Sequence, residues 1–311
     1  MERPEDYKLL TTLNISYKNL TKIPSWISDC EKLEILICSY NKIIYIDNLP
    51  QTLEILDCKC NKITQLNKLP TALKNLNCSN NKITHLDNLP QTLEIIKCYA
   101  NQITELNNLP QTLKELFCSY NQIIQIDNLP PTLEILHCTY NQIIQLDNLP
   151  ITLKYLFCYE NQITQLDNLP QTLQTLYCHS NEIIQLDNLP QTLQTLYCEC
   201  NSITHLDNLP QTLTELSCHS NEITQLDNLP TTLKYLICYD NLLKYEFEPT
   251  LENIRNYNNQ NNLNNLNNLN NQNNLNNLNN LNNLNNLNNL NNLNNLNNLN
   301  NLNNLNNQNK K

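Results

Sequence analysis

The sequence predicts a solenoid whose repeats share one parallel sheet, followed by a low-complexity tail. Three observations predict this fold class. The dipeptide Leu-Pro recurs every 20 residues from Leu49 to Leu229. Apolar residues occupy the same positions in each 20-residue unit, and the 311 residues contain no glycine. A fixed period of this length is the sequence signature of stacked repeats.

Each repeat is expected to begin with a short strand. In residues 53–70 the template reads Leu-x-x-Leu-x-Cys-x-x-Asn-x-Ile-x-x-Leu-x-x-Leu-Pro. Strand alternation turns Leu56 and Cys58 toward the inside and their neighbours toward the opposite face. Such units start at Leu33 and every 20 residues after it, and a 23-residue variant precedes them from Leu10. Stacked copies then form one curved parallel sheet along the concave side.

The stretch opposite the strand, for example residues 63–72, is too short and too interrupted by proline for a helix. We therefore expect extended or polyproline-like backbone on the convex side. Residues 1–257 are expected to form one solenoid of about twelve repeats with short terminal caps, and residues 251–257 fit a short capping helix.

The remaining segment, residues 258–311, consists of Asn, Leu and Gln up to its two final lysines. Leucine at every third position gives no stable apolar face on a helix or on a strand. We therefore expect this tail to be disordered. Asparagine-rich tracts also self-associate, so a structural or assembly role driven by the tail is the alternative to a binding role for the repeats.

The repeat template resembles the leucine-rich repeat, and its 20-residue Leu-Pro unit is similar to the short class of secreted bacterial effectors. The resemblance covers residues 10 to about 243. Cysteine at the second inward position and the glycine-free, asparagine-rich composition look most like leucine-rich-repeat proteins of giant viruses of amoebae. The resemblance implies a horseshoe that recognises proteins, with no catalytic function.

Three columns of identical residues recur with the same period. The first column is asparagine, from Asn41 to Asn241, and the second is cysteine, from Cys38 to Cys238. The third is aspartate, which directly precedes Asn-Leu-Pro in most repeats, from Asp47 to Asp227. We expect the asparagines to bond the backbone where the chain leaves each strand. The cysteines are expected to be buried and apolar, with a metal-thiolate row as the alternative. The aspartates are expected to form Asx-turns, with calcium binding as the alternative.

Function is expected where repeats differ, at exposed positions of the concave sheet. The central position carries Ile37, Asp57, Asn77, Lys97, Phe117, His137, Phe157, Tyr177, Tyr197, Ser217 and Ile237. The predicted partner-binding residues are Phe117, His137, Phe157, Tyr177 and Tyr197, with Tyr159 and His179 beside them. Aromatic rings contribute much contact area at low entropic cost, which favours protein binding. The alternative is that these rings only fill a half-buried pleated surface.

One cluster is a candidate metal site. His179, Glu199 and His219 occupy the same column in three adjacent repeats. Two imidazoles and a carboxylate can hold a divalent metal, which makes a metal-assisted enzyme the third hypothesis. The outer two strands lie about 9.6 Å apart, which is far for ligands of one ion. We therefore expect no catalytic residues, no metal and no cofactor.

Composition restricts the classes of partner and the cellular compartment that we expect. The absence of glycine excludes phosphate-binding loops, and a net charge of −10 opposes nucleic-acid binding. No apolar stretch is long enough to span a membrane. The N-terminus lacks a secretory signal, and fourteen cysteines fit a reducing cytoplasm, which is the host cytoplasm if the protein is viral. The expected partner is an unidentified protein, which would belong to an amoebal host if the chain is viral.

Overall fold

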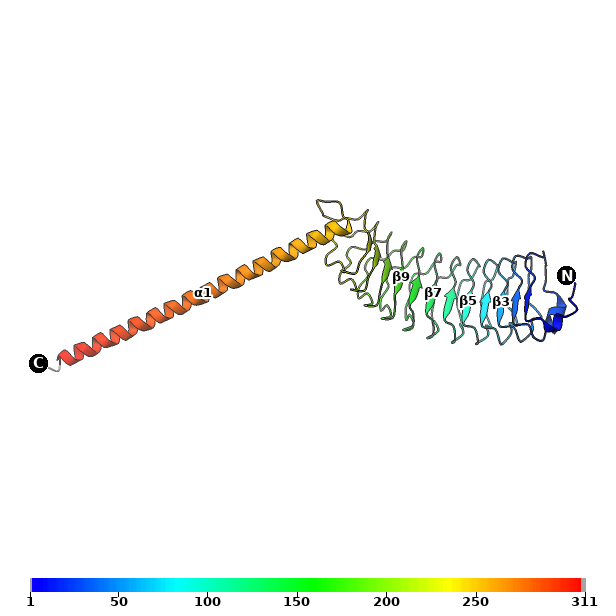
Figure 1. The fold of residues 1–311 in the computed structure, drawn as a ribbon, viewed down its shortest axis with the longest axis horizontal. Helices are drawn as coiled ribbons and strands as arrows, with labels where there is room; N and C mark the ends of the chain where they lie inside the picture. The colour runs from blue at the N-terminus through cyan, green and yellow to red at the C-terminus, as the bar shows by residue number, and fades with distance from the viewer. Residues whose placement is uncertain (1, 309–311) are drawn as a thin grey trace. The chain divides into compact units, whose positions relative to one another are not determined.

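The computed structural model describes residues 2–308 and divides into two compact units, the first ending at Asn253 and the second beginning at Ile254. The first unit contains one sheet of twelve parallel strands, ordered as in the sequence (Figure 1). The strands are β1 Thr12–Asn14, β2 Ile35–Ile37, β3 Ile55–Asp57, β4 Asn75–Asn77, β5 Ile95–Lys97, β6 Glu115–Phe117, β7 Ile135–His137, β8 Tyr155–Phe157, β9 Thr175–Tyr177, β10 Thr195–Tyr197, β11 Glu215–Ser217 and β12 Tyr235–Ile237. The predicted solenoid with a parallel sheet is confirmed.

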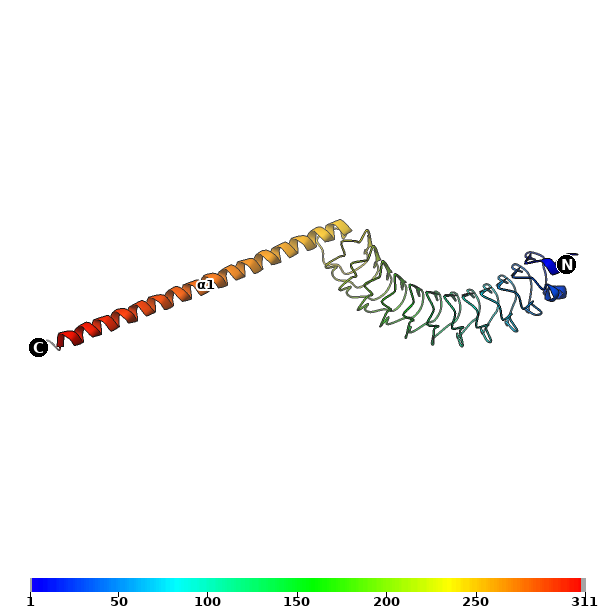
Figure 2. The same cartoon turned by 60° about the horizontal axis from the view of Figure 1, so that its bottom comes forward.

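The repeats of the first unit follow a curved path (Figure 2). Two short 3₁₀ helices are present, Tyr7–Leu9 before the longer first repeat and Ser25–Asp29 within it. In the 20-residue repeats the convex side contains no helix, as expected. There the chain turns directly after each Leu-Pro, where the N–H of Leu53 donates to the carbonyl of Pro50 at 3.3 Å and later repeats do the same.

The core runs along the inside of the solenoid as columns of leucine, isoleucine and cysteine. In one central repeat Leu133, Leu136, Cys138 and Ile143 are all completely buried. The eleven cysteines of the repeated column are buried free thiols, as predicted, and only Cys200 among the fourteen is exposed. Burial raises the pKa of the column thiols, because a thiolate would lose its hydration there.

The asparagine column connects each repeat to the one before it. The side-chain amide of Asn141 donates to the carbonyl of Cys138 at 3.0 Å and to that of Cys118 at 3.1 Å. Its oxygen accepts the N–H of Ile123 at 3.0 Å. This pattern recurs from Asn61 to Asn241. The predicted bonding of the backbone is confirmed, and it also crosses between repeats.

A column of threonines before the strands also forms hydrogen bonds to the backbone of the preceding repeat. The hydroxyl of Thr132 donates to the carbonyls of Leu113 and Gln111, both at 2.8 Å. Equivalent threonines do so in every repeat from Thr92 to Thr232. Ala72 stands at this position in one repeat, so that repeat lacks the hydroxyl.

The expectation of Asx-turns at the aspartates is wrong. The bonds recorded for these carboxylates come from the glutamine two residues earlier, for example from Gln145 to Asp147 at 2.6 Å. The turn is made instead by the following residue, because Asn148 and its equivalents have a left-handed φ near +50°. Asparagine tolerates this conformation better than other residues with a Cβ, which explains its place before Leu-Pro.

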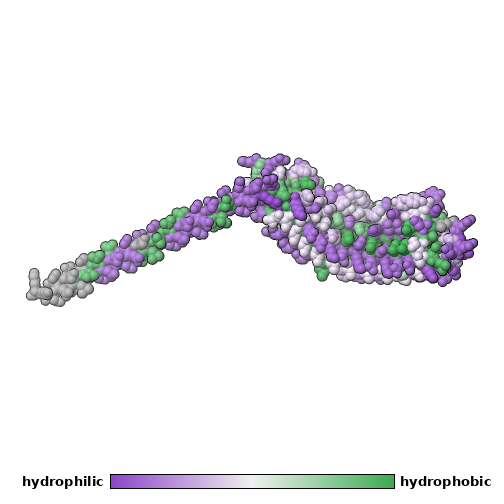
Figure 3. Space-filling model, viewed as in Figure 1, coloured by the Kyte–Doolittle hydropathy of each residue, from purple (hydrophilic) through white to green (hydrophobic). Residues whose placement is uncertain are grey.

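The second unit begins within α1, a helix that spans Leu251–Gln308. Its start at Leu251 agrees with the predicted capping helix. The triplet pattern favoured disorder from residue 258 onward, whereas the described residues up to 308 continue the helix; residues 309–311 lie outside the described part. The leucines from Leu263 to Leu299 are each about 60% exposed, and hydrophobic patches recur along α1 (Figure 3). The helix satisfies its backbone internally and needs no apolar face to do so.

Candidate functional site

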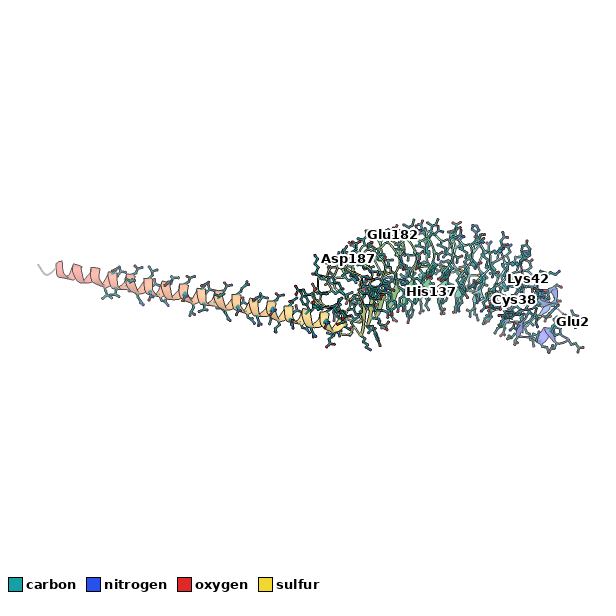
Figure 4. The ribbon with its side chains drawn as sticks, turned by 90° about the horizontal axis from the view of Figure 1, so that it is seen from above. Glu2, Cys38, Lys42, His137, Glu182 and Asp187 are labelled. Carbon is teal, nitrogen blue, oxygen red and sulfur yellow. The ribbon has the colours of Figure 1, made fainter. Side chains whose placement is uncertain are left out.

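The middle of the concave sheet carries five rings in five consecutive strands. The pairing register places Phe117, His137, Phe157, Tyr177 and Tyr197 opposite one another at the ends of β6 to β10. Because buried leucine precedes each ring and buried cysteine follows it, strand alternation turns all five toward the concave side. Figure 4 shows His137 on the inner side of the arc and Glu182 on its outer side. We call these five residues the central ring row.

The rings of this row touch one another without a break. Ring centres lie 4.8 Å apart between Phe117 and His137 and 3.9 Å apart between His137 and Phe157. Phe157 meets Tyr177 edge to face at 4.9 Å, and Tyr177 stacks on Tyr197 at 4.5 Å. Stacked and edge-to-face contacts are the favoured geometries of aromatic pairs. The five residues that the sequence placed at one strand position therefore form one continuous surface in the structure.

A second line of rings follows the edge of the same surface. Tyr120 stacks on Tyr140 at 4.3 Å, Tyr140 meets Tyr159 edge to face at 5.7 Å, and Tyr159 stacks on His179 at 4.2 Å. We call these four residues the rim ring row. Tyr159 and His179 were predicted from the sequence, whereas Tyr120 and Tyr140 were not.

Sequence reasoning missed Tyr120 and Tyr140 because they follow the strand. Both have a left-handed φ, of +56° and +52°, which breaks the alternation used to find the concave positions. Tyr120 is 55% exposed and Tyr140 is 39% exposed. The signal that could have found them is a tyrosine repeated directly before the column asparagine, at positions 40, 120 and 140. A bulky residue in this conformation is strained by about 1–2 kcal/mol.

The central ring row is half-buried, whereas binding residues were expected at exposed positions and a half-buried pleated surface was the alternative. Each ring covers its neighbour, so only part of the row meets solvent. Burial lowers the pKa of His137 to about 4, because the imidazolium would lose hydration between two phenylalanines. His137 is therefore neutral at neutral pH and behaves as a third apolar ring between Phe117 and Phe157.

The two ends of the central ring row differ in charge. At the first end the Lys97 ammonium lies 5.2 Å from the centre of the Phe117 ring, a cation–π contact. At the other end the Tyr197 hydroxyl donates to a carboxylate oxygen of Glu215 at 3.1 Å. Burial, followed by this bond and by the charge of Glu215, raises the pKa of Tyr197 to about 12. The row therefore runs from a cation to a carboxylate.

The structure does not support a metal site at His179, Glu199 and His219. Within residues 2–308 no group of three or more His, Cys, Asp or Glu side chains is placed to hold a metal ion. Each imidazole lies beside a serine hydroxyl, His179 at 3.4 Å from Ser180 and His219 at 3.1 Å from Ser220. His179 and His219 follow β9 and β11 by two residues each, so the repeat that contains β10 lies between them.

Sequence comparison identifies a known repeat in the centre of the array. Residues 120–158 match the family model described as FNIP Repeat. This segment includes Tyr120, His137, Tyr140 and Phe157, which belong to the two ring rows. No curated protein matches the chain. None of the described helices is long and apolar enough to cross a membrane.

Structure comparison finds leucine-rich-repeat proteins. YopM from Yersinia enterocolitica is 28% identical, with a TM-score of 0.60, over 76% of this chain and 62% of its own. The functional domain of InlJ from Listeria monocytogenes is 28% identical, with a TM-score of 0.60, over 77% of this chain and 65% of its own. An internalin, InlF from Listeria monocytogenes, is 22% identical, with a TM-score of 0.65, over 78% of this chain and 84% of its own.

The chain therefore spans somewhat less than two thirds of YopM and of InlJ. InlJ is described as including a cysteine ladder, a feature that this chain shares in its buried column of eleven thiols. The first unit therefore has the fold of the leucine-rich-repeat proteins it resembles, and residues 120–158 match the FNIP repeat.

Proposed function

We propose that this leucine-rich-repeat solenoid is a non-enzymatic module that binds a protein partner on its concave face, with the central ring row at the centre of the contact. The observation that carries the proposal is the unbroken contact of five rings across β6 to β10. The same sheet position holds polar residues elsewhere, at Asp57, Asn77 and Ser217. The frame of the repeat therefore does not require rings at this position.

The stacked arrangement favours binding for an energetic reason. Rings that already contact each other on both sides keep their rotamers, so little side-chain entropy is lost when a partner covers them. Large, rigid aromatic side chains are also the residues that most often dominate protein interfaces. The rim ring row adds exposed area beside the central row, mainly from Tyr120 and Tyr140.

The test compares partners captured by the full chain and by a variant without the row. In the variant, Phe117→Asn and Phe157→Asn are combined with Tyr177→Ser and Tyr197→Ser. Asparagine and serine are the residues that the chain itself uses at this position, at Asn77 and Ser217, so the repeat frame accepts them. The expected result is loss of the captured protein at equal amounts of folded variant.

The matched control changes exposed residues away from the concave face. Ile124, Ile144 and Ile184 are 50–58% exposed, and threonine occupies their column in other repeats, for example at Thr164. The triple variant Ile124→Thr, Ile144→Thr, Ile184→Thr should keep the captured protein. Retention of the same partner by the ring variant, or its loss from the isoleucine variant alone, would refute concave-face binding.

The cytoplasm is the compartment that we propose, and the host cytoplasm if the protein is viral. Eleven buried thiols with raised pKa values stay protonated and unpaired, which suits a reducing compartment. On the viral reading the lysate for the capture experiment is that of an amoebal host, and the partner is a host protein.

An assembly role is the second candidate, and the exposed leucines of α1 favour it. From Leu263 to Leu299 these side chains are about 60% exposed at every third position with one interruption. Burying them in contacts between copies would be favourable, at about 25 cal/mol per Å² of apolar surface. Sedimentation velocity of the full chain and of a chain ending at residue 257 tests this role, which requires that only the full chain forms assemblies.

A further inference from the structure

The acidic end of the central ring row indicates the chemistry of the partner. The segments around β9, β10 and β11 contain two carboxylates, Glu199 and Glu215, and neither lysine nor arginine. These segments are residues 174–181, 194–201 and 214–221. These carboxylates lie on either side of the row, since Glu215 begins its strand and Glu199 follows its strand by two residues. At about 3.3 Å per residue they bracket the row by roughly 13 Å along the strand direction.

Carboxylates earlier in the sheet have cations of this chain beside them. The Lys114 ammonium lies 2.7 Å from Glu94, and the Lys154 ammonium lies 2.7 Å from Glu134. The column that supplies these lysines changes to Gln174, Gln194 and Thr214 in the next three repeats. The alternation of lysine and glutamate between neighbouring repeats therefore stops where the acidic end begins.

Glu199 is the strongest single observation. Its carboxylate oxygen Oε2 is buried, and it makes no hydrogen bond within the part of the chain that the structure describes. A buried carboxylate oxygen without a donor is costly, because it has lost hydration and gained nothing in return. Burial is the main cause that raises the pKa of Tyr177, Tyr197, Cys178 and Cys198, and the charge of Glu199 adds to it. Within the described residues neither Glu199 nor Glu215 forms an ion pair with a lysine or arginine, and the charge that acts on Glu199 from this column is that of the His179 imidazole when it is protonated.

Aromatic rings beside carboxylates favour one kind of cation. A guanidinium lies flat on a ring and donates to carboxylates in a planar fork, whereas an ammonium does neither as well. Tyr177 and Tyr197 supply the rings, and Glu199 and Glu215 supply the acceptors. At the other end of the row a cation of the chain itself lies on a ring, because the Lys97 ammonium is 5.2 Å from the centre of the Phe117 ring.

We propose that the concave surface of β9 to β11 binds a protein segment that presents arginine side chains to Tyr177, Tyr197, Glu199 and Glu215. This inference rests on the proposed function and specifies the partner that the surface recognises. One arginine lies on the tyrosine pair, and its guanidinium pairs with the half-buried Glu199 carboxylate.

The test measures binding of a fluorescently labelled hexa-arginine peptide to the full chain by anisotropy, at pH about 7. The double variant Glu199→Gln, Glu215→Gln should bind about tenfold more weakly, as expected for loss of close charge pairs. The matched control, Glu182→Gln with Glu222→Gln, makes the same change of net charge at exposed positions after the column asparagine. It should change the affinity less than about twofold.

Labelled hexa-lysine and hexa-glutamate peptides complete the experiment. Hexa-lysine should bind more weakly than hexa-arginine, and hexa-glutamate should not bind. Equal weakening by both glutamate pairs, or equal affinity for arginine and lysine peptides, would overturn the inference. If hexa-arginine fails while the ring variant still loses its captured protein, only this inference fails; if the ring variant keeps that protein, the proposed function fails.

Discussion

Replacing Asn141 with leucine tests how the asparagine column stabilises the solenoid. The side-chain amide of Asn141 donates to the carbonyls of Cys118, Cys138 and Thr139, and its oxygen accepts the N–H of Ile123. Leucine has a similar size and none of these groups, so the substitution removes all four bonds without a large change of volume.

The structure shows which of the four losses matters most. The carbonyl of Cys118 also accepts from Asn121 at 2.9 Å, and that of Cys138 also accepts from Asn161 at 3.1 Å. Both carbonyls therefore keep a partner in the variant. The N–H of Ile123 does not, because Asn141 is its recorded acceptor and the residue is completely buried. One orphaned buried N–H costs about 1–3 kcal/mol, and the lost bonds add roughly 1 kcal/mol.

We therefore expect the free energy of unfolding to fall by about 2–4 kcal/mol. The assay is urea denaturation followed by circular dichroism, with an unchanged slope confirming that the midpoint reports stability. The neighbouring variant Gln142→Leu changes an exposed side chain to the same residue and should stay within about 0.5 kcal/mol of the wild type. A midpoint for Asn141→Leu equal to that of Gln142→Leu would refute the reasoning.

Three further predictions follow from other features. Ala72→Thr restores the hydroxyl donor to the carbonyls of Leu53 and Gln51 and should raise stability by about 0.5–1.5 kcal/mol; an unchanged denaturation midpoint would contradict the threonine column. Burial lowers the pKa of His137 from 6.5 to about 4, so the neutral imidazole contributes its full stability above pH 6.5, and this contribution is lost as the pH falls toward 4. In melting curves across that range, His137→Phe should lose less stability than the wild type. Burial raises the pKa of the Cys38, Cys78 and Cys118 thiols from 9.0 to about 12, so their contribution to stability is complete below pH 9 and is lost toward pH 12; an unchanged melting temperature between pH 8 and pH 11 would count against the burial of these thiols.

Much of the candidate site could be predicted from the sequence, because the 20-residue period fixes which residues share a position on the sheet. Phe117 and Tyr197 were placed in one row from spacing alone. The period could not predict that the row is half-buried, because burial depends on how far each ring leans over its neighbour. Nor could it place Tyr120 and Tyr140 in the rim ring row, since their left-handed backbone interrupts the alternation.

The sequence by itself determined the solenoid, the inward columns and the asparagine bonds, because each of these repeats and a repeated pattern has one consistent register. Only the tertiary structure decided which residue makes the turn before Leu-Pro, where Asn148 and not Asp147 takes the left-handed φ. Only it showed that Glu199 has a buried oxygen without a donor. Both depend on the packing of one repeat against the next, which spacing along a single chain does not encode.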